Sequence, residues 1–162
     1  MVSLPLANTG IDNAQEFLGL TNGACSYIYR WGGSSWQIYS AAGGTNFPVR
    51  VGEGYMLYCL NATSTMNFIG NQLPEQAPSI RLSTGPNYMG LPVQAGSMTA
   101  ESLLQQIDTA TGNTTCPYLY KMENGQYVVH SIGLSLNNFQ LRNGEGYIAQ
   151  CTNGGEVAIS TS

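Results

Sequence analysis

Charged side chains are scarce in this chain: only 9% of its residues are Asp, Glu, Lys or Arg, against about 25% in an average soluble domain. One Lys and four Arg are present, and the formal net charge is −4. A chain with so few cations cannot neutralise many phosphates, so nucleic acid is not an expected partner. The same shortage argues against binding to anionic membrane surfaces.

Long hydrophobic runs are missing as well. No apolar stretch approaches the roughly 20 residues that a transmembrane helix needs, so membrane insertion is not expected. The first residues lack the basic and apolar regions of a secretory signal. A secreted form of the protein would therefore have lost its targeting sequence upstream of Met1.

Side chains that commonly form reaction centres are few. The single histidine is His130, nine acids are present, and no Cys-x-x-Cys pair occurs. Neither a phosphate loop, a dinucleotide-binding fingerprint nor a calcium loop can be found. We therefore expect no enzyme activity, no catalytic residue, no cofactor and no bound metal, and we expect His130 at the surface.

Apolar and uncharged polar residues make up most of the chain. Hydrophobic residues account for 43% and aromatic residues for 10%, which is enough to build a core. Gly, Ser, Thr, Asn, Gln and Tyr fill most of the remainder. This composition is typical of a β-rich extracellular protein whose surface forms hydrogen bonds without carrying much charge.

One stretch occurs twice and organises the rest of the chain. Phe47–Leu60, FPVRVGEGYMLYCL, returns as Phe139–Thr152, FQLRNGEGYIAQCT. Phe, Arg, the Gly-Glu-Gly-Tyr run and a Cys recur at matching offsets. The pattern predicts a tandem duplication with repeat one at residues 1–70, a linker at residues 71–78 and repeat two at residues 79–162.

Each repeat is predicted to be a small β-sheet module with one short helix, which makes the fold class mainly β (α+β). The expected order is a strand, a helix, a hairpin, a second hairpin at Gly-Glu-Gly, and a closing strand. Thr99 is a suitable N-cap for the helix of repeat two, and Asp12 with Gln15 resembles a capping box in repeat one. Asn124-Gly125 predicts a two-residue hairpin turn.

Alternation along the strands divides the first hairpin of repeat one into two faces. The face that is richer in aromatic residues is expected to be the core: Cys25, Tyr27, Tyr29, Trp31, Trp36 and Ile38. The opposite face is expected to offer the candidate ligand-binding residues: Tyr39, Tyr58, Arg30 and Gln37. Because repeat two has His130 and Gln150 in place of the two tyrosines, a stacking site is expected in repeat one only.

The cysteines predict one disulfide in each repeat. Four cysteines allow three pairings, and the duplication favours Cys25 with Cys59 and Cys116 with Cys151. Buried free thiols and metal ligation are the alternatives, and the second is weakened by the lack of Cys-x-x-Cys spacing. Each bridge would stabilise its repeat by roughly 3–4 kcal/mol and would place the protein outside a reducing cytosol.

The two Gly-Glu-Gly-Tyr runs allow a catalytic or a structural interpretation. A catalytic carboxylate pair needs two acids at a defined separation, and each run has one. We therefore interpret the runs as turns in which glycine supplies a positive φ and an Arg pairs with the Glu. The residues of this motif are Arg50, Gly52, Glu53, Gly54, Tyr55, Arg142, Gly144, Glu145, Gly146 and Tyr147.

The two repeats differ at their starts. Ile80–Asn87 has the pattern of a strand and a turn, and nothing equivalent precedes Met1. Repeat one is therefore expected to lack an opening strand and to present an unpaired sheet edge. Either the chain was cut from a longer array, or a neighbour supplies the missing strand.

The combined pattern resembles a known kind of module. Gly85-x-Asn87-x-x-x-Leu91-Pro92-Val93, a short Ala-x-x-Leu-Leu helix, an aromatic hairpin and Gly-Glu-Gly-Tyr are similar to tandem β-rich modules of secreted and cell-surface proteins of bacteria and archaea. The resemblance covers most of both repeats. It implies an extracellular, non-catalytic module, often one of several in a large surface protein.

Three functions follow as hypotheses. The leading one is a structural or adhesive module of a cell-surface or filamentous assembly, which associates with copies of itself or with neighbouring modules through the open edge of repeat one. The alternative is a carbohydrate-binding module that binds glycans with exposed aromatic residues of repeat one. A hydrolase or other enzyme is the third, and it is disfavoured because titratable groups are few.

Overall fold

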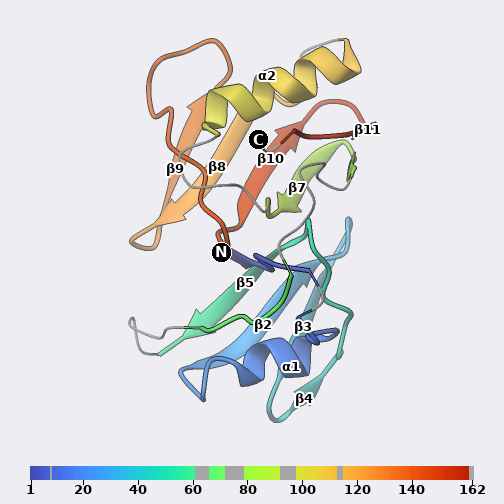
Figure 1. The fold of residues 1–162 in the computed structure, drawn as a ribbon, viewed down its shortest axis with the longest axis vertical. Helices are drawn as coiled ribbons and strands as arrows, with labels where there is room; N and C mark the ends of the chain where they lie inside the picture. Colours follow the sequence, from blue (N-terminus) through green and yellow to red (C-terminus); the bar gives the residue numbers. More distant parts are fainter. Residues whose placement is uncertain (8, 61–65, 72–78, 92–97, 113–114, 161–162) are drawn as a thin grey trace.

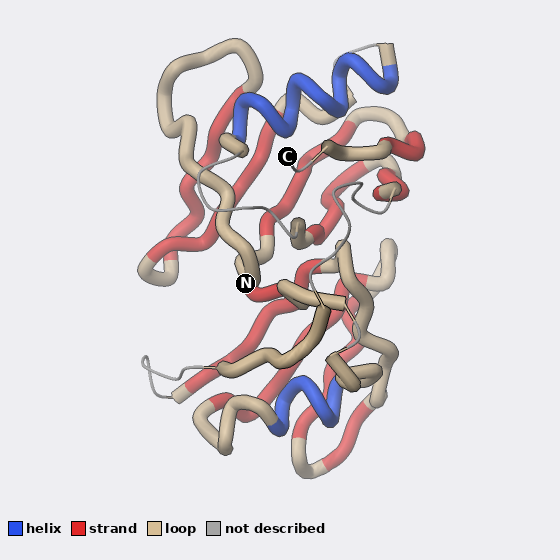
Figure 2. Tube along the Cα trace, viewed as in Figure 1, coloured by secondary structure: helices blue, strands red, loops and turns tan. Residues whose placement is uncertain are grey.

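The computed structural model describes residues 1–7, 9–60, 66–71, 79–91, 98–112 and 115–160. It is mainly β, with 42% strand and 13% helix, as the sequence predicts. The strands form separate sheets, and the two helices lie at opposite ends of the molecule (Figure 1, Figure 2). The N-terminus lies between the two sheets (Figure 1). Apart from Asn71, the predicted linker lies outside the described residues.

Repeat one forms a five-stranded antiparallel sheet of order β1-β5-β2-β3-β4. Helix α1 (Ala14–Gly19) packs on the inner face of the sheet through Phe17 and Leu18 and closes the core of this repeat. The strands are β1 (Val2–Ser3), β2 (Cys25–Trp31), β3 (Trp36–Ser40), β4 (Gly43–Gly44) and β5 (Gly54–Cys59).

Helix α1 begins one residue later than the capping box predicted at Asp12 and Gln15. The N-cap is Asn13, whose side-chain oxygen accepts the backbone N–H of Glu16 at 3.1 Å. The backbone N–H of Asp12 instead donates to the Glu16 carboxylate at 2.7 Å. Asn competes well with Asp as an N-cap, and two neighbouring candidates cannot be separated by type alone.

Repeat two forms a four-stranded antiparallel sheet of order β7-β10-β8-β9, with a separate pair β11-β6. Helix α2 (Ala100–Thr111) is capped by Thr99, the predicted N-cap, and buries Leu103, Leu104 and Ile107 in a second core. The strands are β6 (Ile80–Leu82), β7 (Gly85–Met89), β8 (Tyr118–Glu123), β9 (Gln126–Ser131), β10 (Tyr147–Cys151) and β11 (Gly155–Val157).

Both disulfides are those that the duplication favours. Cys25 bonds to Cys59 and Cys116 to Cys151. Each bridge ties the start of the aromatic hairpin, at Cys25 in β2 or at Cys116 just before β8, to the strand that follows the Gly-Glu-Gly turn. The described chain contains no free cysteine. Two bridges in a chain of this size indicate a non-cytoplasmic, oxidising environment.

The face of the aromatic hairpin predicted to be the core is in fact largely the outer face. Tyr27, Trp36 and Ile38 are about two-fifths exposed, whereas Ile28, which follows Tyr27 and therefore faces the other way, is fully buried. The cause is a register shift in the pairing of β2 with β5 between Cys25 and Tyr27. A bulge adds one residue to a strand, so alternation counted from Cys25 assigns every later side chain to the wrong face.

His130 is buried, not at the surface as the sequence analysis expects. Its Nε2 lies 2.7 Å from Glu101 Oε2 and its Nδ1 lies 2.9 Å from the Leu136 carbonyl oxygen. Burial favours the protonated form of Glu101, but hydrogen bonds from His130, Gly133 and Gln105 outweigh it and hold the pKa of this carboxyl below its ordinary value. His130 therefore links β9 to the start of α2.

Candidate functional site

The Gly-Glu-Gly-Tyr motif closes a turn with the tyrosine hydroxyl. In repeat one the Tyr55 hydroxyl accepts the backbone N–H of Arg50 at 2.7 Å and donates to the Glu53 carboxylate at 2.8 Å. Tyr147 repeats both contacts with Arg142 and Glu145 at the same distances. Burial, reinforced by the adjacent carboxylate, raises the pKa of each hydroxyl, so both remain donors at physiological pH.

The two glycines of the motif have different tasks. The first, Gly52 or Gly144, has a positive φ of 91° or 82°, as predicted. The second has no room for a side chain, because a Cβ on Gly54 would lie 2.8 Å from the Met89 carbonyl oxygen. A Cβ on Gly146 would lie 3.0 Å from the carbonyl oxygen of Val2.

These close approaches form the joint between the repeats. The backbone N–H of Gly90 donates to the Gly52 carbonyl at 3.1 Å, and that of Ser3 donates to the Gly144 carbonyl at 2.9 Å. Each turn thus receives a strand of the other repeat. Sequence reasoning missed this role, although the signal was present: a conformational need explains one glycine of each run and leaves the other without a reason.

The charged residues of the two turns are paired differently. Arg142 lies 4.0 Å from Glu145, as the turn interpretation predicts. In repeat one the partner of Glu53 is Arg30, which contacts both carboxylate oxygens at 2.8 and 2.9 Å and also donates to Gln37 at 3.2 Å. The expected pair of Glu53 with Arg50 is therefore wrong.

The four predicted ligand-binding residues do not form one site. Arg30 donates a hydrogen bond to Gln37, and Tyr39 is partly buried and packs against the core of repeat one. Tyr58 lies on the opposite face and is 54% exposed. The same register shift explains the error, because it exchanges the two faces of the hairpin.

The outer side of both sheets instead carries a continuous set of aromatic rings. Ring centroids are 6.1 Å apart for Tyr27–Tyr58, 6.4 Å for Tyr29–Trp36 and 4.9 Å for Trp36–Tyr88. Repeat two extends the set to Tyr127, which with Tyr88 lines one groove together with residues of repeat one. We call these residues the aromatic face: Tyr27, Tyr29, Trp31, Trp36, Tyr58, Tyr88 and Tyr127.

The groove in the aromatic face has a volume of about 480 Å³ and is lined by both repeats. Within the described residues, the hydroxyls of Tyr29, Tyr58, Tyr88 and Tyr127 have no hydrogen-bond partner. Burial raises the pKa of the Tyr88 hydroxyl, so it stays protonated. The groove therefore offers flat apolar rings together with unused hydrogen-bonding groups.

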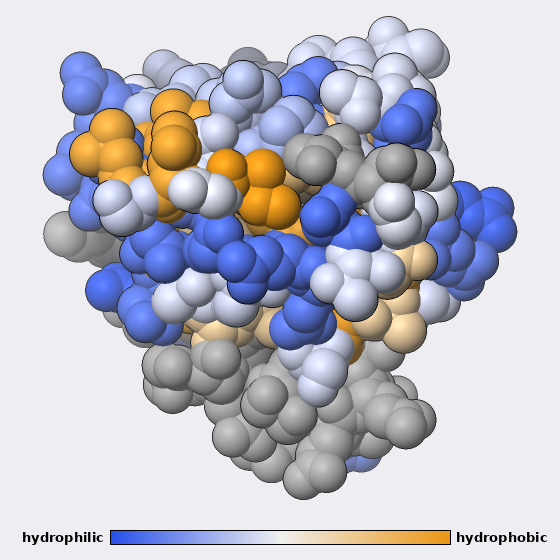
Figure 3. Space-filling model, turned by 90° about the horizontal axis from the view of Figure 1, so that it is seen from above, coloured by the Kyte–Doolittle hydropathy of each residue, from blue (hydrophilic) through white to orange (hydrophobic). Residues whose placement is uncertain are grey.

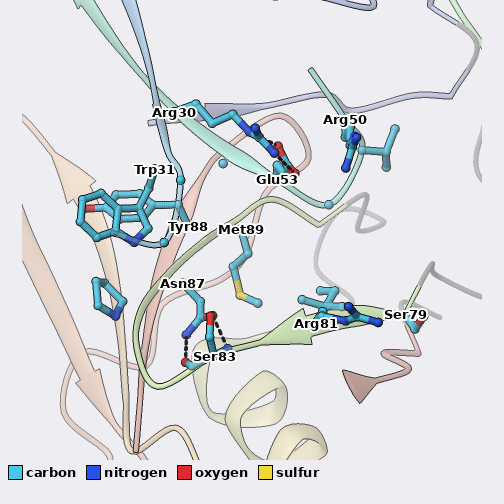
Figure 4. Close-up of a pocket in the computed structure, with 17 residues that line it drawn as sticks. Arg30, Trp31, Arg50, Glu53, Ser79, Arg81, Ser83, Asn87, Tyr88 and Met89 are labelled. Atoms are coloured by element: carbon cyan, nitrogen blue, oxygen red, sulfur yellow. Dashed lines mark hydrogen bonds and ion pairs between the residues drawn. The ribbon is translucent and has the colours of Figure 1, made fainter. Parts of the chain in front are cut away.

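A second cavity, of about 440 Å³, lies between the repeats beside the groove. Figure 4 shows Arg50 and Glu53 on the wall formed by repeat one, and Arg81, Asn87 and Tyr88 on the wall formed by repeat two. We call it the joint cleft. Tyr88 lines both the joint cleft and the groove.

The α2 end of the molecule differs from the aromatic face in the hydropathy of its surface. Seen from above, its coloured surface is mostly hydrophilic, and hydrophobic side chains gather at one side (Figure 3). Across the part of the chain that the structure describes, no three His, Cys, Asp or Glu side chains come together as they would around a metal ion. None of the helices described is long and apolar enough to cross a membrane.

Comparison with protein-family models, with curated proteins and with solved structures finds no match to this chain. The arguments on function therefore rest on the groove, the joint cleft and the duplicated sequence.

Proposed function

We propose that this protein is a non-catalytic extracellular module that binds carbohydrate on its aromatic face. The observation that carries the proposal is the exposed ring set centred on Trp36. Soluble proteins seldom leave a contiguous apolar patch exposed without a binding role. A sugar ring presents a flat apolar face and a polar rim, and the groove matches both needs with ring surfaces and unused tyrosine hydroxyls.

The shape of the groove supports an extended ligand. Small-molecule sites are mostly apolar concavities of about 300–1,000 Å³ with a few polar groups, and this groove falls in that range. Its lining comes from β2, β3 and β5 of repeat one and from β7 and β9 of repeat two. A ligand in the groove would therefore contact both repeats, which differs from the expectation of a site in repeat one alone.

The disulfides and the resemblance to secreted and surface modules support an extracellular setting. Binding to glycans outside the cell would make the protein adhesive. The proposal therefore combines the adhesive module of the leading hypothesis with the carbohydrate-binding module of the alternative. The aromatic face favours glycan recognition over a purely structural role because burying rings in the core is the default use of such residues, and here they are outside.

Replacing Trp36 by Ala is expected to lower the affinity for a bound oligosaccharide about tenfold or more, because large aromatic side chains supply most of the contact energy in such sites. A glycan array with wild-type protein identifies the oligosaccharide, and isothermal titration calorimetry compares the variants. Tyr118→Ala is the matched control: Tyr118 is 42% exposed but lies outside the groove. Equal losses in both variants, or no binding on the array, would contradict the proposal.

A second candidate, self-association through a sheet edge, has its own observation. All five residues of β10 pair with β7, whereas β1 pairs only with Gly54 and Tyr55 of β5. Among the described residues, Met56–Cys59 has no strand on that side. An open edge accepts a further strand by main-chain hydrogen bonds.

This candidate predicts concentration-dependent assembly into fibres or long arrays. Sedimentation velocity across a wide concentration range measures it, and electron microscopy identifies the product. A monodisperse monomer at every concentration would count against self-association and would leave the glycan proposal untouched.

A further inference from the structure

The joint cleft concentrates most of the positive charge of an acidic protein. The chain has five cationic side chains and a net charge of −4. Three of the five, Arg30, Arg50 and Arg81, line this one cavity, and Glu53 is the single acid among the described residues that line it. A cleft lined by one sign of charge focuses its field on ligands of the opposite sign.

Two of the three guanidinium groups form no ion pair among the described residues. Arg30 is held by Glu53 through two hydrogen bonds of 2.8 and 2.9 Å. Its counterpart in repeat two is a lysine, Lys121, which pairs with Glu123, and there the turn glutamate Glu145 has its own arginine at 4.0 Å. In repeat one Arg30 has taken that place, so Arg50 is released and forms no ion pair within the described chain.

Arg81 likewise forms no ion pair within the described chain. Glu156 lies opposite Arg81 in the pairing of β6 with β11. However, the Glu156 carboxylate accepts the Ser79 hydroxyl at 2.7 Å, and no ion pair with Arg81 forms in the part of the chain that is described. Arg50 comes from the turn of repeat one and Arg81 from β6 of repeat two (Figure 4), so each wall of the cleft carries a cation that has no ion-pair partner among the described residues.

We propose that the joint cleft is an anion subsite and that the ligand of this protein is an acidic glycan, with carboxylate or sulfate groups on its sugar rings. This inference rests on the proposed function. Arginine suits such groups because its planar fork matches two oxygens of a carboxylate or sulfate. Tyr88, which lines both cavities, places the anion subsite next to the ring surface.

A sugar chain stacked on the aromatic face would then place one acidic substituent between Arg50 and Arg81. Arg30 is not assigned a direct role, since Glu53 neutralises its charge and Glu53 and Gln37 accept three of its five N–H donors. Its contribution is to keep Glu53 away from Arg50. The subsite also needs both repeats, which gives the close joint at Gly54 a functional use.

The test compares three probes on the intact protein by calorimetry: tetragalacturonate, its methyl ester, and a sulfated carrageenan tetrasaccharide. The ester has the same sugar rings without the charge. We expect wild type to bind at least one acidic probe about tenfold more tightly than the ester, with an affinity that falls as salt is raised. The two acidic probes distinguish carboxylate from sulfate as the recognised group.

The variant Arg50→Gln/Arg81→Gln is expected to lose this tenfold preference and to bind the ester as wild type does. Arg142→Gln is the control, because Arg142 is the counterpart of Arg50 in repeat two and lies outside the joint cleft. Equal binding of the acidic probes and the ester by wild type, or a preference that survives in the double variant, would overturn the anion subsite while the groove still binds sugar. Failure of every probe, together with an empty glycan array, would overturn the proposed function as well.

Discussion

Removing the disulfide of repeat two by the double substitution Cys116→Ala/Cys151→Ala is expected to lower the free energy of unfolding by roughly 3–4 kcal/mol. The two cysteines are 35 residues apart, and a loop of that length loses much conformational entropy in the unfolded chain when it is closed. Both residues are buried at 2% exposure, so the variant also loses packing in the core. Urea unfolding followed by circular dichroism measures the difference.

The bridge of repeat one provides the matched comparison. Its two cysteines are 34 residues apart, so the bridge removes nearly the same conformational entropy from the unfolded chain. However, Cys59 lies at the surface, whereas Cys25 is buried. Cys25→Ala/Cys59→Ala should therefore cost somewhat less than the repeat-two variant, and mild reductant should open this bridge first. A loss below about 1 kcal/mol for Cys116→Ala/Cys151→Ala would show that the bridge is not what holds repeat two together.

The disulfides could be predicted because the duplication provided the same information twice. Four cysteines alone allow three pairings. Two copies of the motif with matching offsets favour one of these pairings. The turn at Asn124-Gly125 and the N-cap at Thr99 were predictable for a related reason. Each depends on residues within a few positions of one another, where local preference and tertiary structure agree.

The face of the hairpin could not be predicted, and that error moved the candidate site. Alternation is a reliable guide until one extra residue is inserted, and nothing in the run from Cys25 to Trp31 marks the register shift beside Tyr27. The composition even favoured the wrong answer, since aromatic residues usually fill a core. Tyr39, predicted to bind ligand, is consequently part of the packing, while Trp36 and Tyr29 line the groove.

Contacts between residues that are distant in the sequence were also beyond reach, both within a repeat and between the repeats. The pairing of Arg30 with Glu53 joins residues 23 positions apart in the sequence, and His130 meets Glu101 over 29 positions. Tyr88 belongs to repeat two yet contacts Trp31 and Trp36 of repeat one. The first two contacts depend on how strands, turn and helix pack within a repeat, and the Tyr88 contacts depend on how the two sheets meet. Neither strand periodicity nor turn chemistry specifies these arrangements.

Replacing Gly54 by Ala is expected to lower the free energy of unfolding by about 1–3 kcal/mol, the usual range for overpacking. The new methyl group would meet three backbone atoms of Met89 at 2.8 to 3.1 Å. Backbone atoms of a paired strand cannot turn aside as a flexible side chain does, so either the joint opens or β7 shifts. Gly19→Ala is the control, because a Cβ on Gly19 would meet nothing within 4 Å.

The aromatic rings at the joint provide a second and more specific measurement. The chain has two tryptophans, and both contact Tyr88 across the joint, with ring centroids 6.2 Å apart for Trp31 and 4.9 Å apart for Trp36. A displaced β7 carries Tyr88 away from both rings, so the tryptophan emission of Gly54→Ala should change under native conditions, well before unfolding. Gly19→Ala should leave it unchanged. If Gly54→Ala keeps both wild-type stability and wild-type emission, the two repeats are not held in close backbone contact, and a groove shared between them loses its physical basis.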